Sequence, residues 1–310
     1  MHNLCRSYGT KWRRNITARI IDGKTISAKV RAEVSEGVRT FKGAEGRAPG
    51  LVAVLVGNDA ASHTYVRNKE KSCIEVGMTT EVCRMPASTT QDELTTVVQA
   101  YNSDPRFDGI LVQLPLPRHM NAAMVTRFIN PLKDVDGLHP ENMGLLLAGE
   151  ARFVPATPLG VQRLLREDGI RVEGARVVIC GRSNIVGKPL AALLMQRGEG
   201  ANATVTVCHT GTRDLAVETR RADILIAATG NPRSITADMV RPGAVVIDVG
   251  ISRIEDLTTK SGFRLAGDVD YGPVSEIASA MTPVPGGVGP MTIAMLLDNV
   301  LRAAQLATSR

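Results

Sequence analysis

The sequence predicts an α/β fold with two α/β domains, the second a Rossmann-type doubly wound parallel sheet. Uninterrupted apolar runs of strand length alternate with amphipathic stretches. A glycine-containing loop at 181–187 joins one such run to a helical stretch. The length of 310 residues suits two domains better than one. We expect an N-terminal extension over 1–17, a first domain over 18–155, a second over 156–290, and a C-terminal helix over 291–310 that returns to the first domain.

Charge and composition exclude two classes of protein. The net charge is +6, but Arg6, Lys11, Arg13 and Arg14 supply four of these charges in a stretch without acids. We therefore expect no nucleic-acid-binding surface. The same stretch lacks the apolar core of a signal peptide, and it fits a disordered extension, an upstream start codon or a transit-like segment. No run approaches 18 uncharged apolar residues, so no membrane span is expected.

The cysteines and histidines indicate neither disulfides nor a metal site. The five cysteines form no CxxC pair, and the five histidines form no HxxxH pattern. An odd, scattered set of cysteines is typical of reduced thiols. We therefore expect a cytoplasmic protein without a bound metal.

The first half alternates between helical and strand patterns, as in a βαβ unit. Prolines at 115 and 117 end the third apolar run, because proline cannot continue a central ladder. Ser62 is expected to cap the second helix. The expected helices cover 26–41, 62–77 and 90–101, and the expected strands cover 51–56, 80–85 and 109–114.

A polar, proline-containing stretch over 150–158 is expected to cross to the second half. The second half has the alternation of a doubly wound nucleotide-binding sheet. The expected strands cover 176–180, 204–208, 224–228 and 245–249, and the expected helices cover 161–167, 188–197, 215–221 and 292–306.

The loop at 181–187 is the candidate phosphate-binding element. Its first residues are Gly181, Arg182 and Ser183, and it opens a helix whose N-terminus can bind an anion. The spacing is not GxGxxG, so a structural strand-to-helix turn also fits. The next strand ends at His209 and Thr210 without the acid that usually binds the ribose diol of NAD. Arg182 and Thr210 could bind a 2′-phosphate instead, which favours NADP.

Four polar residues of the first half are candidates for chemistry. Tyr65 and Lys69 are four positions apart and share a helix face, although a surface pair on an amphipathic helix would have the same spacing. Gln113 ends a buried strand, where open α/β sheets bind their ligands, or it merely caps that strand. Asp134 and Asp136 precede Gly137, a pattern that also fits an aspartate-rich turn.

Together these segments resemble the bifunctional methylenetetrahydrofolate dehydrogenase/cyclohydrolase family, the FolD-type enzymes. The order and spacing of the segments agree with the family from about Arg19 to the last helix. The departures are the additional N-terminal stretch, a longer segment over 197–203, Thr210 in place of serine, and Gly211 in place of a larger residue. The matching segments are Ser62–Lys69, Gln113–Pro117, Asp134–Gly137, Gly181–Pro189, Val249–Ile251 and Thr282–Thr292.

The resemblance implies two reactions in a folate cleft between the halves. These are NADP-dependent oxidation of 5,10-methylenetetrahydrofolate to 5,10-methenyltetrahydrofolate and hydrolysis of that product to 10-formyltetrahydrofolate. It implies that Lys69 is the acid/base, that Gln113 holds Lys69, that Tyr65 contacts folate and that Asp136 binds the pterin edge. It also implies a homodimer. The further contacts implied are Val112, Leu114, Pro285, Gly286 and Gly289 for folate, and Gly181, Arg182, Ser183, Thr210 and Ile251 for NADP.

Three other functions remain open from the sequence. The protein could be a dehydrogenase-only member of this family, or another NADP enzyme with two halves, such as a shikimate-dehydrogenase-like or amino-acid dehydrogenase. It could also be a non-catalytic regulator that binds NADP. Turnover of methylenetetrahydrofolate would separate these alternatives.

Overall fold

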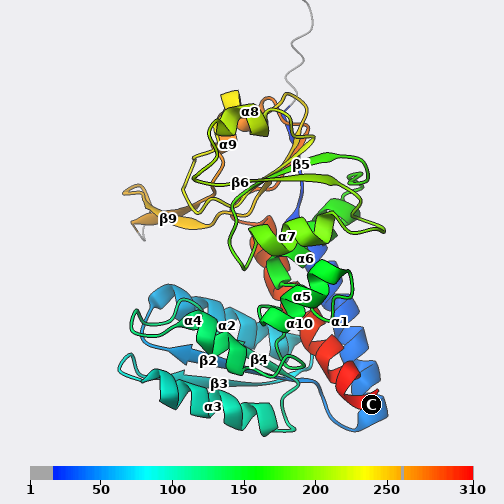
Figure 1. Cartoon of the computed structure of the whole chain (residues 1–310), viewed down its shortest axis with the longest axis vertical. Helices are drawn as coiled ribbons and strands as arrows, with labels where there is room; N and C mark the ends of the chain where they lie inside the picture. The colour runs from blue at the N-terminus through cyan, green and yellow to red at the C-terminus, as the bar shows by residue number, and fades with distance from the viewer. Residues whose placement is uncertain (1–16, 260–261, 310) are drawn as a thin grey trace, which may run out of the picture.

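The computed structural model describes residues 17–259 and 262–309. The extension expected over 1–17 therefore lies, apart from Thr17, outside the described residues. Figure 1 shows two α/β halves, one above the other, with long helices that lie beside the lower half and reach up to the upper half. None of the helices in these described ranges combines the length and apolar character that a membrane crossing requires.

The first half is built on a three-stranded parallel sheet in the order β3-β2-β4. Every residue of the central strand is buried, because the two faces contact different cores. Alternate residues from Leu51 pack towards α2, and those from Val52 pack towards α3. The elements are β2 (Gly50–Val56), α2 (Ala60–Glu75), β3 (Thr79–Met85), α3 (Gln91–Ser103), β4 (Gly109–Val112), α4 (Ala122–Phe128) and α5 (Pro140–Ala148).

The second half contains a six-stranded sheet in the order β1-β11-β8-β7-β5-β6, whose paired strands are all parallel. The strand order reverses at β5, which confirms the predicted doubly wound sheet. An antiparallel hairpin of β9 and β10 projects from this half (Figure 1). The strands are β1 (Arg19–Ile20), β5 (Arg176–Cys180), β6 (Thr204–Cys208), β7 (Ile224–Ala227), β8 (Val245–Asp248), β9 (Ser252–Glu255), β10 (Phe263–Ala266) and β11 (Ala280–Met281).

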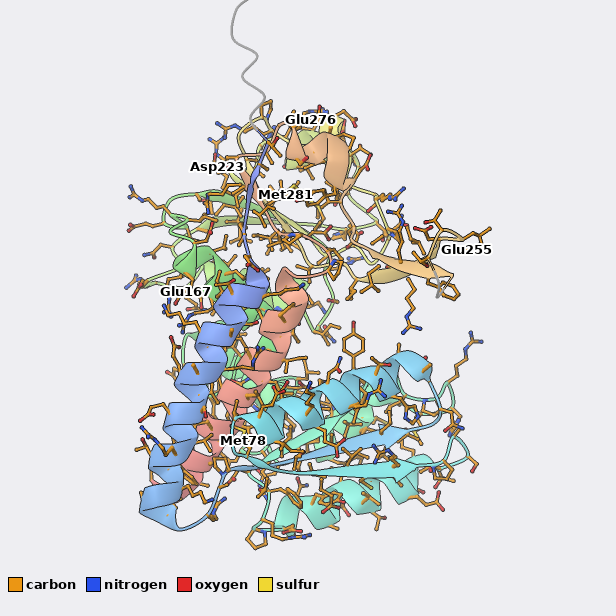
Figure 2. All side chains as sticks on the ribbon, turned by 180° about the vertical axis from the view of Figure 1, so that it is seen from behind. Met78, Glu167, Asp223, Glu255, Glu276 and Met281 are labelled. Atoms are coloured by element: carbon orange, nitrogen blue, oxygen red, sulfur yellow. The ribbon has the colours of Figure 1, made fainter. Side chains whose placement is uncertain are left out.

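The helices of the second half flank this sheet, and two long helices join it to the first half. Figure 2 shows α1 and α10 side by side from behind, with Glu167 near the upper end of α1. Lys29 of α1 forms an ion pair of 2.6 Å with Glu167, the last residue of α6. The remaining helices are α1 (Gly23–Glu45), α6 (Ala156–Glu167), α7 (Gly187–Leu194), α8 (Leu215–Thr219), the 3₁₀ turn η1 (Ala237–Met239), α9 (Tyr271–Ser275) and α10 (Val288–Thr308).

The structure corrects several local predictions. Ser62 does not cap α2: the cap is Asp59, whose carboxylate accepts hydrogen bonds from the backbone N–H and the hydroxyl of Ser62, both at 2.7 Å. α1 starts at Gly23, three residues earlier than expected, because Asp22 accepts from the N–H groups of its first turn. β4 is shorter than expected and ends at Val112, and α7 ends at Leu194 rather than at residue 197.

Two glycines of α1 give a matched test of the packing between α1 and the segment that precedes α10. A Cβ atom on Gly23 would lie 1.8 Å from the Gly287 carbonyl oxygen, whereas one on Gly43 would meet nothing within 4 Å. We expect Gly23→Ala to destabilise the fold by about 1–3 kcal/mol. Gly43→Ala should stabilise it by roughly 0.5–1 kcal/mol, since alanine favours a helix interior. Thermal unfolding followed by circular dichroism measures both, and equal melting temperatures would contradict this account.

Candidate active site

One face of α2 lines a cavity of about 850 Å³ between the two halves. Tyr65 and Lys69 share this face, as their spacing predicted, and Asn68 and Ser72 lie beside them. The opposite walls of the cavity come from three segments at the ends of strands and helices. These are Gln113–Pro115 after β4, Asp248–Ile251 at the end of β8, and Pro283–Pro290 at the start of α10.

Lys69 and Gln113 form the polar centre of this cavity. The Lys69 Nζ donates to Gln113 Oε1 at 3.0 Å, and Gln113 Nε2 donates to the Leu114 carbonyl at 2.6 Å. The second bond fixes the orientation of the amide, so that its oxygen faces the amine. Burial lowers the pKa of Lys69, while the Asp136 carboxylate raises it. The amine can therefore lose a proton more readily than an exposed lysine.

The two aspartates before Gly137 have different tasks. Asp134 is 1% exposed, and its carboxylate accepts from the N–H groups of Leu138 and His139 at 3.2 and 2.8 Å. This is the aspartate turn that the pattern alone allowed. Burial raises the pKa of Asp136, and Lys69 lowers it. Asp136 is thus close enough to feel the Lys69 charge, although it does not line the cavity itself.

Tyr65 lies at the mouth of the cavity, with 39% of its surface exposed. Partial burial raises the pKa of its phenol, and the Arg253 charge on β9 lowers it. The phenol therefore stays protonated near neutral pH. Its ring offers an apolar face to a planar ligand, and its hydroxyl offers a donor.

The segment before α10 brings backbone close to the cavity. A cis peptide bond precedes Pro285, and Gly286 has a φ of +113°. A side chain at Gly286 would be strained, and it would come within 3.3 Å of the Lys24 side chain. Gly289 and Ile251 also line the cavity, and Ile251 is 45% exposed. This wall thus presents mostly backbone and apolar surface to a ligand.

Sequence reasoning missed Asp248, which ends β8 and lines the same cavity. Burial raises the pKa of this carboxyl to about 6. It accepts from the N–H groups of Gly250, Asp268 and Val269, so it orders the loop that carries Ile251. The signal was available, since Asp248 ends a buried strand and Gln113 directly follows one. Other missed lining residues include Lys24, Arg31, Asn68, Ser72 and Thr157.

The predicted phosphate-binding loop joins β5 to α7. A Cβ atom on Gly181 would lie 2.1 Å from the Ala228 carbonyl oxygen, and one on Gly187 would lie 2.0 Å from that of Gly181. Only glycine fits at these two positions, which keeps the loop tight against the sheet. Arg182 and Ser183 are exposed. The loop meets the cavity only at Ile185 and Val186.

Thr210 follows β6, the strand beside β5, and is exposed. Among the residues described beyond β6, the next acid is Asp214, which caps α8 by accepting from the Val217 N–H at 3.1 Å. The Asp214 carboxylate is therefore already used as a helix cap.

The predicted site residues fall into two groups. Tyr65, Lys69, Gln113, Leu114, Ile251, Pro285, Gly286 and Gly289 line the cavity, whereas Val112, Asp136, Gly181, Arg182, Ser183 and Thr210 do not.

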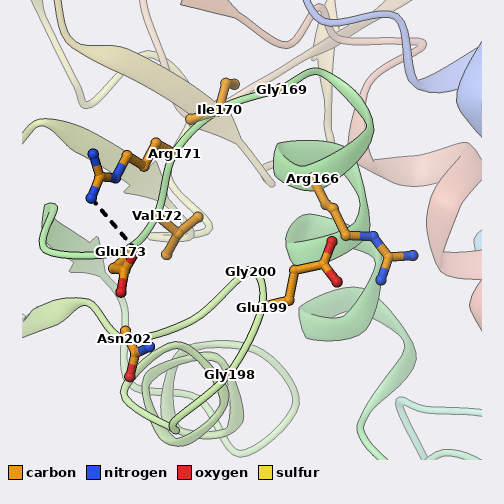
Figure 3. A pocket seen from close by; sticks show the side chains of 10 residues that line it. All are labelled: Arg166, Gly169, Ile170, Arg171, Val172, Glu173, Gly198, Glu199, Gly200 and Asn202. Carbon is orange, nitrogen blue, oxygen red and sulfur yellow. Dashed lines mark ion pairs between the residues drawn. The ribbon is translucent and has the colours of Figure 1, made fainter.

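A second hollow of about 390 Å³ lies apart from this cavity, between the loops that follow α6 and α7. Figure 3 shows Arg171 and Glu173 paired on its wall, at 3.5 Å, with Arg166 and Glu199 on the other side. No residue of the predicted site lines it. The predicted site residues that line a cavity therefore all lie in the larger one.

Comparisons with known proteins agree over both halves. A family model described as tetrahydrofolate dehydrogenase/cyclohydrolase, catalytic domain, matches residues 21–136. A second, described as the NAD(P)-binding domain of the same family, matches residues 155–308. The bifunctional protein FolD of Chlorobium phaeobacteroides is 56% identical over 286 residues, which cover 92% of this chain and 97% of that protein.

Solved structures show the same two-half arrangement. The bifunctional enzyme FolD of Campylobacter jejuni is 45% identical, with a TM-score of 0.87, over 94% of this chain and 99% of that chain. The FolD of Trypanosoma brucei, complexed with NADP cofactor and inhibitor, is 38% identical, with a TM-score of 0.89 over the same shares.

The Lys69–Asp136 interaction can be tested in the free protein. Because the Asp136 charge raises the Lys69 pKa against the effect of burial, Asp136→Asn should move the Lys69 titration to lower pH. NMR of isotope-labelled lysine side chains measures this. Lys133 is an internal control, since burial lowers its pKa too but its charged neighbours are Asp108, Asp104 and Arg47. An upward or absent shift at Lys69 would contradict the interaction.

Proposed function

Because the chain belongs to the tetrahydrofolate dehydrogenase/cyclohydrolase family, we propose that its cleft carries out both reactions of that family at one site. The protein is a bifunctional enzyme of folate one-carbon metabolism. It oxidises 5,10-methylenetetrahydrofolate with NADP⁺ and hydrolyses the methenyl product to 10-formyltetrahydrofolate. The observation that carries the proposal is the partly buried Lys69 amine, hydrogen-bonded to Gln113 in a cavity bounded by both halves.

Folate is proposed to enter this cavity with its pterin ring towards Asp136. A carboxylate suits the pterin edge, which presents adjacent N–H donors. The Tyr65 ring is placed to contact the planar part of the substrate, since it stands half-exposed at the mouth of the cavity. Val112 and Leu114 flank Gln113 at the end of β4. Pro285, Gly286 and Gly289 are proposed to let backbone pass close to the folate.

Lys69 is proposed to act in the hydrolytic step. Water attacks the methenyl carbon, and the neutral amine takes a proton from that water as the carbon–oxygen bond forms. The adduct then opens by cleavage of the bond from this carbon to one ring nitrogen, which receives a proton, and a carbonyl forms. Gln113 would hold the amine at the reacting carbon.

The second half fits a dinucleotide. Gly181 and Gly187 have no side chains, so at these two positions the tight loop can bring its backbone close to a diphosphate. Arg182, Ser183 and Thr210 are proposed to bind the adenosine phosphate groups, and Ile251 to contact the nicotinamide from the wall of the cavity. When bound, NADP⁺ accepts the hydride. The residues of the cavity serve to align the two ligands.

We further propose the division expected from the sequence, with the folate half over 18–155, the cofactor half over 156–290, and a returning helix over 291–310. The packing of α1 against α10 supports the return. β1 is an exception, since it joins the sheet of the other half.

A homodimer and a cytoplasmic location also remain proposals. Strand β6 is at the edge of its sheet, and its residues alternate between exposed and partly buried, which would allow pairing with a second copy. Cys73, Cys83, Cys180 and Cys208 are free thiols, which supports a reducing compartment.

The role of Lys69 predicts unequal losses of the two activities. Lys69→Gln should lower the cyclohydrolase rate by roughly 10²–10⁴-fold, the usual contribution of a general acid or base. It should reduce hydride transfer less, because that step depends mainly on alignment. Absorbance at the methenyl and NADPH bands follows each step separately. Lys42→Gln, in the last turn of α1 and away from the cavity, is the control. An equal loss of both activities in a folded variant would refute the assignment.

The cofactor preference gives a second test. A guanidinium–phosphate contact is worth roughly 1.5–3 kcal/mol. Arg182→Ala should therefore lower NADP⁺ affinity by about ten- to hundredfold and leave NAD⁺ affinity unchanged. The matched control is Arg171→Ala, which alters the second hollow instead. Steady-state kinetics with both cofactors decide the matter, and a wild type that uses both equally would eliminate the 2′-phosphate contact.

A further inference from the structure

A single buried amide ties the turn before Asp136 to the C-terminal helix. Asn299 of α10 is 2% exposed. Its Nδ2 donates to the Val135 carbonyl at 2.8 Å and to the Val154 carbonyl at 2.9 Å. Both amide hydrogens are therefore used on backbone acceptors from two separate segments.

The two carbonyls lie at positions that matter for the cleft. Val135 directly precedes Asp136, and it is fully buried. Val154 lies in the segment that crosses from the first half to α6. A side chain at Gly137 would come within 2.9 Å of the nitrogen of Pro155, so the turn and the crossing segment are in direct contact. Asn299 thus joins the turn, the crossing segment and α10 at one point.

The position of Asp136 depends on how the backbone around it is held, because its own carboxylate does not anchor it. In the described part of the chain, no hydrogen bond holds the Asp136 carboxylate, although the Lys69 charge acts on it. Its direction is therefore set by the backbone on either side. On the C-terminal side of Asp136, the backbone N–H groups of Leu138 and His139 donate hydrogen bonds to the Asp134 carboxylate, which fixes the turn. On the N-terminal side, the side-chain amide of Asn299 donates to the Val135 carbonyl.

Removing that amide would leave two buried carbonyls without partners, and the turn could relieve this only by moving. We propose that Asn299 is a positioning residue for Asp136, which it fixes beside the cleft by holding the carbonyls of Val135 and Val154. This inference rests on the proposed role of Asp136 in folate binding. It assigns to α10, whose first residues line the cavity, a further role in substrate recognition through a side chain that holds the turn before Asp136.

A double-mutant cycle tests the proposal. Asn299→Leu, similar in size but without donors, is made in the wild type and in the Asp136→Ala background. In the wild type we expect Asn299→Leu to raise the KM for methylenetetrahydrofolate about tenfold or more, because the Asp136 carboxylate would be displaced from the substrate. The KM for NADP⁺ should change little. In the Asp136→Ala background the same substitution should change the folate KM less than twofold, because the group it positions is gone.

The control variant is Leu301→Ala on the same helix. Leu301 packs against Gly37 of α1, so its loss destabilises α10 without touching the turn. It should lower the melting temperature and leave the folate KM unchanged. A folate KM equally raised by Leu301→Ala would mean that Asn299 acts only through stability and would overturn the proposal.

Other outcomes are equally decisive. An equal effect of Asn299→Leu in both backgrounds, or no effect in the wild type, would overturn the positioning role. The Asp136→Ala variant alone tests the proposed function, since an unchanged folate KM there would remove Asp136 from the folate site. If Asn299→Leu does not fold, Asn299→Ser, which retains one donor, enters the same cycle and is judged by the same criteria.

Discussion

The Lys69 amine is partly buried on the cavity wall, where its charged form is disfavoured unless an acceptor or an opposite charge is near. Gln113 supplies the acceptor at 3.0 Å, and Asp136 supplies the charge. These three groups come from α2, from the end of β4 and from the turn that follows α4. Each is fixed by a different part of the fold, so the protonation of one amine depends on the relative positions of all three. The cleft therefore tolerates little movement within the first half.

The helices α1, α6 and α10 pack together and set the distance between the two halves. The first residue of α1 packs directly against the Gly287 carbonyl, one residue before α10. The hydroxyls of Thr157 and Thr292 meet at 2.9 Å between α6 and α10. Small residues at these contacts bring the helices close together. The wall that carries Pro285 and Gly286 is thereby held opposite α2, where the substrate must fit.

The sequence predicted the sheets well, because fully buried parallel strands have continuous apolar runs such as 51–56. It predicted the cavity-lining Tyr65, Lys69 and Gln113 from helix spacing and from the rule for strand ends. The residue pattern alone could not separate Asp134 from Asp136, which only the family resemblance selected, since their difference lies in which one accepts from the backbone of the turn. β1 and β11 have two residues each, too few for any periodicity. Lys24 and Arg31 reach the cavity only because distant helices pack together.

The pairing of β1 with β11 has a consequence for synthesis of the chain. Arg19 leaves the ribosome about 260 residues before its partner Ala280, and α1 leaves long before α10. Strands β5 to β8 can assemble as soon as they emerge, whereas the first half must wait for the last helix to complete its core. A nascent or prematurely terminated chain therefore exposes one side of α1 to solvent and to chaperones. The two halves are consecutive in the gene but are not independent units of folding.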